Sequence, residues 1–160
     1  MIPTTRGWLN TLQLGLLVSA IGWGISFYFT FASWKVAADE LYGMGAGIIA
    51  YRPMFDYWLR MASSVFGCIG IASILACVRP KTFASLIYLL GPFHFVIGIT
   101  LAAAAYNNQL NTRMHPTFVA DIIFCFLAGT LIQIPLIYNW KRLRNIDSAA
   151  SPGSLPVSSV

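Results

Sequence analysis

Four long apolar stretches constrain this chain more than any other feature of its sequence. They run over residues 9–33, 55–78, 82–106 and 117–140, and each reaches the about 20 residues that a helix needs to cross a bilayer core. Because lipid leaves no partner for an open backbone N–H or C=O group, we expect each stretch to be helical. We therefore predict an all-α fold, an integral membrane four-helix bundle made by residues 1–145.

The composition leaves little room for a soluble domain. The chain is 58% hydrophobic and 9% charged, whereas soluble domains carry about 25% charged residues. Residues 146–160 are rich in Ser, Pro and Ala, and we predict a disordered cytoplasmic tail there. We expect membrane lipids around the protein and no nucleic-acid partner.

Positive charges near the helix ends predict the orientation. The basic residues expected on one side of the membrane are Arg6, Arg79, Lys81, Lys141, Arg142 and Arg144. The other side receives Lys35, Arg52, Arg60 and Arg113. The first apolar run exceeds the roughly 7–15 residues of a signal-peptide core, so we expect an uncleaved first helix. Both termini are then cytoplasmic, in a multi-pass protein.

The longest connection, residues 35–52, contains the apolar and glycine-rich sequence LYGMGAGIIA. Its glycines resemble a phosphate-binding turn, but Ile48 stands where the dinucleotide fingerprint needs its last glycine, and no strand precedes it. We instead expect a short interfacial or re-entrant segment that caps the outer end of the bundle. Irregular backbone at membrane depth needs such cover from protein or water.

Charged residues at the start of the second apolar stretch define the first candidate site. Asp56 and Arg60 are four residues apart and share one helix face. Arg60 and Asp121 each lie about five residues, roughly 7 Å, inside the outer ends of their helices. Asp121 is therefore the first expected partner of Arg60, by depth, and Asp56 the second, by spacing.

Two interpretations of these charges remain open. An ion pair could only fix the register of the helices, or the charges could form a polar pocket at the outer leaflet. Ionisable residues inside membrane segments are functional candidates by default. The candidate ligand-binding residues are Arg52, Asp56, Arg60, His94, Arg113, His115 and Asp121.

His94 lies near the middle of the third apolar stretch, where a structural hydrogen bond is the first expectation and a ligand or proton-carrying role the second. The two histidines differ by about 18 Å in depth, so they cannot share one haem iron. The sequence has no Cys-x-x-Cys, His-Glu-x-x-His or Gly-x-Ser-x-Gly motif. We predict no cofactor, no metal site and no catalytic residues, and expect the protein not to be an enzyme.

One group of residues resembles a known family. Residues 58–61 (WLRM), followed by Gly67, Gly70 and a short turn at Arg79-Pro80, are similar to small bacterial four-helix membrane proteins of the DoxX-like type. The resemblance implies a bacterial inner (cytoplasmic) membrane protein, in some cases an accessory subunit of respiratory or redox complexes. It carries over no catalytic residues.

The expected function is that of a non-enzymatic accessory or structural subunit of a larger membrane complex, with other membrane subunits or copies of itself as partners. One alternative is a lipid-, quinone- or sterol-type ligand-binding protein with a polar pocket at the outer leaflet. A second alternative is a small oligomeric transporter.

The predicted orientation can be tested by cysteine labelling in intact cells. A membrane-impermeant thiol reagent added from outside should label a cysteine placed at Gly45 and should not reach one placed at Ser154. The reverse pattern would overturn the predicted topology.

Overall fold

The computed structural model describes residues 5–113, 115 and 117–149, and all regular secondary structure in this part of the chain is helical. The elements are α1 (Thr5–Ile25), α2 (Tyr28–Phe31), α3 (Trp34–Gly43), α4 (Pro53–Val78), α5 (Ala84–Asn107) and α6 (Thr117–Ala149). Four described segments are long and apolar enough to cross a membrane: Gly7–Phe31, Pro53–Val78, Ala84–Asn107 and Thr117–Tyr138. The predicted all-α membrane bundle is confirmed.

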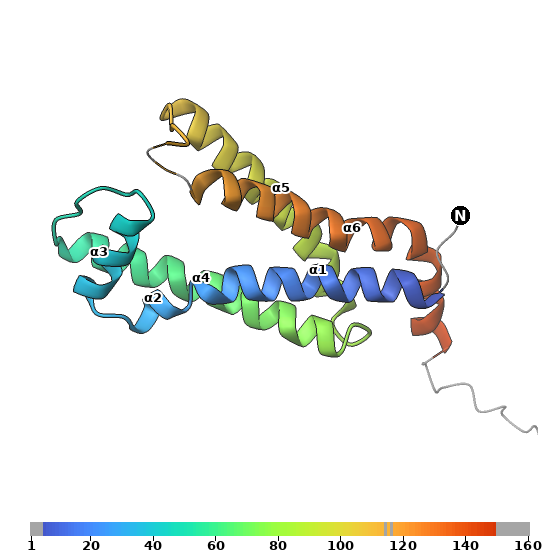
Figure 1. The fold of residues 1–160 in the computed structure, drawn as a ribbon. Helices are drawn as coiled ribbons and strands as arrows, with labels where there is room; N and C mark the ends of the chain where they lie inside the picture. The colour runs from blue at the N-terminus through green and yellow to red at the C-terminus, as the bar shows by residue number, and fades with distance from the viewer. Residues whose placement is uncertain (1–4, 114, 116, 150–160) are drawn as a thin grey trace, which may run out of the picture.

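The long helices associate as two close pairs joined through α1. Helix α1 packs along both α4 and α6, and α5 packs along α6. Helices α4 and α5 follow each other through a short turn at residues 79–83, yet they contact each other far less. Figure 1 shows α2 and α3 at one end of the bundle, called here the α3 end, and the α5–α6 connection at the same end but apart from them. The α5–α6 pair diverges from the α1–α4 pair toward this end.

Small residues explain which helices pack closely. An ideal Cβ built on Gly70 of α4 would lie 2.8 Å from the backbone nitrogen of Gly24 in α1, so only a glycine permits this approach. One turn away, the Ser19 hydroxyl donates to Ser73 Oγ at 2.9 Å, and Ser73 donates to the Ile69 carbonyl at 2.9 Å. This buried hydrogen-bonded chain fixes the register of α1 against α4.

The buried face of α4 differs in one respect from the sequence pattern. Ser63, Gly67 and Gly70 are buried as four-three spacing predicts, but the face then continues through Ser73 and Ala76. A four-three repeat would continue from Gly70 to Ile74, but Ile74 is 50% exposed. The three-residue steps to Ser73 and Ala76 follow the contact with α1, where Ser73 is hydrogen-bonded to Ser19.

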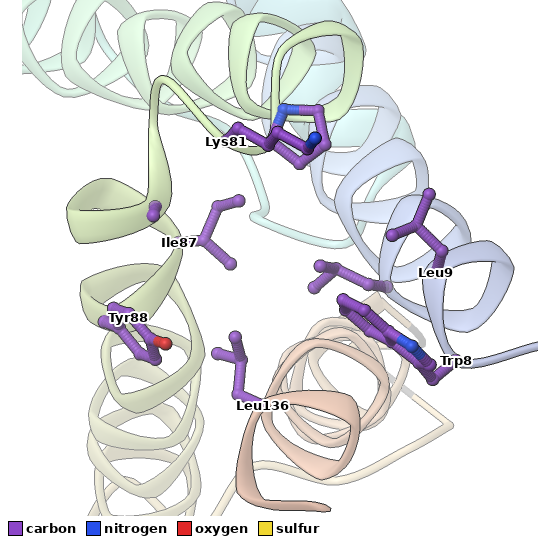
Figure 2. A pocket seen from close by; sticks show the side chains of 9 residues that line it. Trp8, Leu9, Lys81, Ile87, Tyr88 and Leu136 are labelled. Atoms are coloured by element: carbon purple, nitrogen blue, oxygen red, sulfur yellow. The ribbon is translucent and has the colours of Figure 1, made fainter. Parts of the chain in front are cut away.

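The other end of the bundle is closed by an apolar core. Trp8 and Leu12 of α1 pack with Ile87 of α5 and Leu136 of α6. A small cavity of about 90 Å³ lies at this place, and Figure 2 shows Lys81 from the α4–α5 turn among the side chains that line it. The tight packing here contrasts with the divergence of the helix pairs at the α3 end.

The first predicted helix, residues 9–33, is not continuous. Helix α1 ends at Ile25 and the span continues after a break as α2. At the break the N–H groups of Ser26 and Phe27 donate to carbonyls three residues earlier, on Trp23 (3.2 Å) and Gly24 (3.0 Å). Phe27 packs against Gly67 of α4. The break therefore coincides with a tertiary contact that the apolar pattern does not reveal.

The connection at residues 35–52 contains a short helix, and the C-terminal region differs from expectation. Most of the first half of this connection belongs to α3, a helix of 10 residues whose N-cap is Ser33, and the glycine-rich turn after it has positive φ at Gly45 and Gly47. Helix α6 extends to Ala149 instead of ending near 140, so residues 146–149 of the predicted disordered tail are helical. Residues 150–160 lie outside the described part of the chain, as do the side chains of Arg6, Lys141, Arg142 and Arg144.

Replacing Gly67 with leucine should destabilise the protein, because the first added carbon already overlaps the Phe27 ring. Overpacking of this kind costs about 1–3 kcal/mol, which should appear as a lower midpoint of thermal unfolding in detergent.

The matched control is Gly24→Leu in α1, since a Cβ at Gly24 meets nothing within 4 Å. Equal melting of the Gly67→Leu variant and the parent would show that Gly67 does not pack against Phe27.

Candidate functional site

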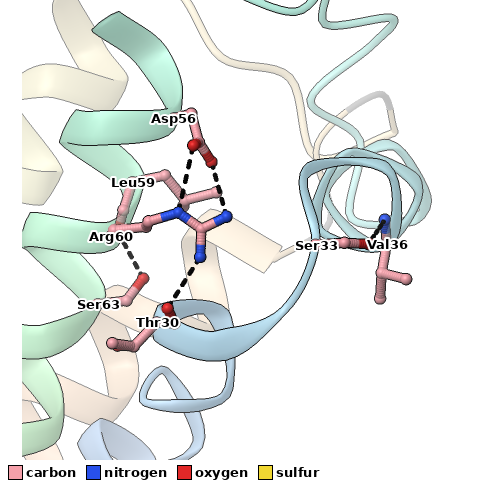
Figure 3. Close-up of polar contacts among 7 residues, drawn as sticks. All are labelled: Thr30, Ser33, Val36, Asp56, Leu59, Arg60 and Ser63. Atoms are coloured by element: carbon pink, nitrogen blue, oxygen red, sulfur yellow. Dashed lines mark hydrogen bonds and ion pairs between the residues drawn. The ribbon is translucent and has the colours of Figure 1, made fainter. Parts of the chain in front are cut away.

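Arg60 is the best-connected charged residue at the α3 end. Its Nη2 lies 3.0 Å from Asp56 Oδ1 in an ion pair, and its Nε donates to Asp56 Oδ2 at 3.2 Å. Nη1 donates to the Thr30 carbonyl at 2.9 Å. Figure 3 shows Arg60 between Asp56 on its own helix and Thr30 on α2.

The pairing of Arg60 is therefore local, and the first predicted partner, Asp121, is wrong. Helix geometry alone places side chains four residues apart on one face, whereas a bond to Asp121 would require α6 to approach α4 at the end where the helix pairs diverge. Because Thr30 belongs to α2, Arg60 also attaches this short helix to α4. This contact gives Arg60 a structural role.

Three other predicted residues each make a separate local contact. The Arg52 guanidinium lies over the Phe55 ring, 5.9 Å from its centroid. Arg113 is exposed, and its backbone N–H donates to Asn111 Oδ1 at 2.9 Å. His115 Nδ1 donates to the Gly45 carbonyl at 2.6 Å, which connects the α5–α6 loop to the turn after α3. Their participation in ligand binding stays a prediction.

His94 occupies the centre of the bundle and is 1% exposed. Its Nδ1 donates to the Leu90 carbonyl at 2.7 Å, and its Nε2 accepts a hydrogen bond from Trp23 Nε1 at 2.9 Å. These two contacts require the neutral tautomer with its proton on Nδ1. The first expectation for His94, a structural hydrogen bond, matches this geometry.

Trp23 is a central residue that the sequence pattern does not single out, because the first apolar stretch contains several large aromatic side chains. The indole N–H of a tryptophan inside a membrane needs an acceptor, and His94 offers one at a similar depth. Trp23 also packs on Phe66 and Phe124, with ring centroids 4.9 Å and 5.5 Å away. The indole thus links α1, α4, α5 and α6.

Two cavities adjoin Trp23. The first, called here the aromatic cavity, has a volume of about 200 Å³ and lies among α1, α4, α5 and α6. It is lined by Gly22, Trp23, Ser26, Phe66, Ile97, Leu101, Asp121, Phe124 and Cys125. In the described part of the chain the Asp121 carboxylate forms no ion pair or hydrogen bond.

The second cavity is a groove of about 510 Å³ between α4 and α5, called here the α4–α5 groove. Trp23 and His94 lie at its inner side, because both are buried. The remaining lining residues are Ser64, Val65, Cys68, Ile69, Ala72, Leu86, Leu89, Leu90, Phe93 and Ile97. Trp23 and Ile97 line both cavities and form a common wall.

Comparison with protein-family models, curated proteins and solved structures gave no match. The fold itself defines the class: this is a multi-pass helical membrane protein. The likeness to DoxX-like proteins stays a prediction.

Replacing Arg60 with alanine should destabilise the protein by about 1.5–3 kcal/mol, the usual value of a hydrogen bond to a charged group. Adding Asp56→Ala should cost little more, because the carboxylate has already lost its partner. Adding Asp121→Ala to the Arg60→Ala variant should change the free energy of unfolding by the same amount as Asp121→Ala alone. A double-mutant cycle of unfolding free energies measures both couplings.

Arg52→Ala serves as the control, since Arg52 makes only an exposed contact with Phe55. A coupling of Arg60 with Asp121 that exceeds its coupling with Asp56 would contradict the observed pairing.

Proposed function

We propose that this protein is a non-enzymatic membrane protein that binds a membrane-dissolved apolar molecule, of the lipid or quinone type, in the α4–α5 groove. The observation that carries this proposal is the groove itself. Its volume of about 510 Å³ lies within the roughly 300–1,000 Å³ of small-molecule sites. Val65 and Leu89, on opposite sides of the groove, are 53% and 56% exposed, so a molecule could enter sideways from the bilayer.

Polar groups must provide the selectivity of such a site. Lipid chains are as apolar as leucine side chains. Replacing a bulk lipid chain on an apolar surface with another apolar molecule therefore changes the binding free energy little. The groove contains the Ser64 hydroxyl and the Cys68 thiol, with the His94–Trp23 pair at its inner side. Because His94 and Trp23 already satisfy each other, a carbonyl or ester oxygen of the ligand would first meet Ser64, whose hydroxyl also forms a 3.3 Å hydrogen bond with Thr30 Oγ1.

A helix from another subunit is the competing occupant, as the accessory-subunit hypothesis expects. Helices associate in membranes mainly through small residues that allow close approach. In this chain Gly70 already faces α1 and Gly67 faces Phe27 at the break after it, while Gly91 and Gly98 face α6. The groove is instead lined mostly by larger side chains, which favours a flexible small molecule over a closely packed helix.

The proposal can be tested by analysing what stays bound to the purified protein. Solvent extraction and mass spectrometry of the parent should find a lipid or quinone in a fixed molar ratio. Val65→Trp should lower this ratio at least severalfold, because Val65 lines the groove. Ile71→Trp is the matched control, since Ile71 is also exposed on α4 but does not line the groove.

Equal retention by both variants would place the bound molecule elsewhere and contradict the proposal. If the Val65→Trp variant loses a co-purifying polypeptide but keeps its bound small molecule, the groove binds a helix of a partner subunit.

A further inference from the structure

The aromatic cavity contains a carboxyl group, on Asp121, that no residue in the described part of the chain pairs with. Asp121 is an exposed residue near the beginning of the membrane span Thr117–Tyr138, and an ionised group that meets lipid there is costly unless it is paired. The cation predicted to pair with it, Arg60, binds Asp56 and the Thr30 carbonyl instead. A cation in the cavity would relieve this cost.

The end of α1 adds to the negative potential at the same place. Gly22 lines the cavity, and in an unbroken helix its carbonyl would accept from the Ser26 N–H. At the break, the Ser26 N–H donates to the Trp23 carbonyl instead. The last carbonyls of a helix carry about half a negative charge. The C-terminal end of α1 therefore favours a cation near Asp121.

Aromatic rings make up much of the remaining wall. Trp23, Phe66 and Phe124 line the cavity and contact one another through Trp23. The indole N–H of Trp23 is bound to His94, so this donor is occupied. Rings of this kind attract ammonium groups through their electron-rich faces, and groups of them recognise quaternary ammonium ligands.

We propose that the aromatic cavity binds an organic ammonium ion, with Asp121 as its counter-ion and the three rings as its apolar walls. Metal ions such as Ca²⁺ take about six to eight oxygen ligands, whereas the lining side chains that offer oxygen are Asp121 and Ser26. An alkylated ammonium group needs one negative charge and an apolar surround, which this cavity provides. The proposal concerns a different cavity from the α4–α5 groove and does not depend on its occupancy.

The test uses choline as the probe, with isothermal titration of the full-length protein in detergent. We expect saturable binding at one site per chain. 3,3-Dimethylbutan-1-ol, which has the shape of choline without its charge, should bind at least tenfold more weakly. Sodium chloride at equal concentration should not displace choline.

Two variants locate the site. Asp121→Asn keeps the size of the side chain and should weaken choline binding at least tenfold, while Asp39→Asn, an exposed acid on α3, should leave it unchanged. Phe124→Leu should weaken binding severalfold with Asp121 intact, so the cavity remains testable even if Asp121→Asn fails to fold. Thermal unfolding of each variant checks its folding.

The source of the ammonium group is resolved by repeating the titration in lipid nanodiscs. If a lipid headgroup is the natural ligand, choline should bind in phosphatidylglycerol discs and be outcompeted in phosphatidylcholine discs. If a soluble amine is the ligand, the two kinds of disc should give equal affinities. No saturable choline binding, equal binding of the neutral analogue, or unchanged affinity in both cavity variants would overturn the proposal.

Discussion

The close approach of α1 and α4 at Gly24 and Gly70 is the contact on which the remaining arrangement depends. No side chain fits between these backbones, and the Ser19–Ser73 hydrogen bond holds the same register. In a bilayer, where burial of apolar surface gives little force between helices, such close contacts decide which helices pair. Because the small residues of α4 face α1 and those of α5 face α6, little remains to draw α4 and α5 together. The α4–α5 groove is a consequence of this division.

The division of the helices into the pairs α1–α4 and α5–α6 also determines which charged residues pair at the α3 end. Arg60 can reach Asp56 by helix geometry alone, and its third contact is a carbonyl of α2. This local solution requires no approach of α6. It also leaves Asp121 without a countercharge in the described part of the chain, next to the C-terminal end of α1 and three aromatic rings. The pairing of Arg60 with Asp56 thus forms a structural ion pair and, among the described residues, leaves Asp121 unpaired in the candidate binding cavity.

Trp23 connects the two cavities physically. Its hydrogen bond to His94 places the indole at the centre of the bundle, where one part of the ring system borders the groove and another borders the aromatic cavity. A change in the position of this ring would alter both sites at once. The break after Ile25 lies two residues beyond Trp23, so the backbone on the C-terminal side of the indole is not held by a continuous helix.

The class of protein and its four spans follow from the sequence alone, which also names Arg60, His94 and Asp121 as ionisable residues inside the spans. Apolar length, helical spacing and the cost of an ionisable group in lipid are local properties, and each can be computed from neighbouring residues. Asp56 was an available partner for Arg60 on spacing alone, but depth in the membrane pointed to Asp121. Only the tertiary structure decided this choice, because it depends on where α6 diverges from α4. The break at Ser26, the acceptor of the Trp23 N–H and the two cavities were likewise decided by contacts between helices far apart in the chain.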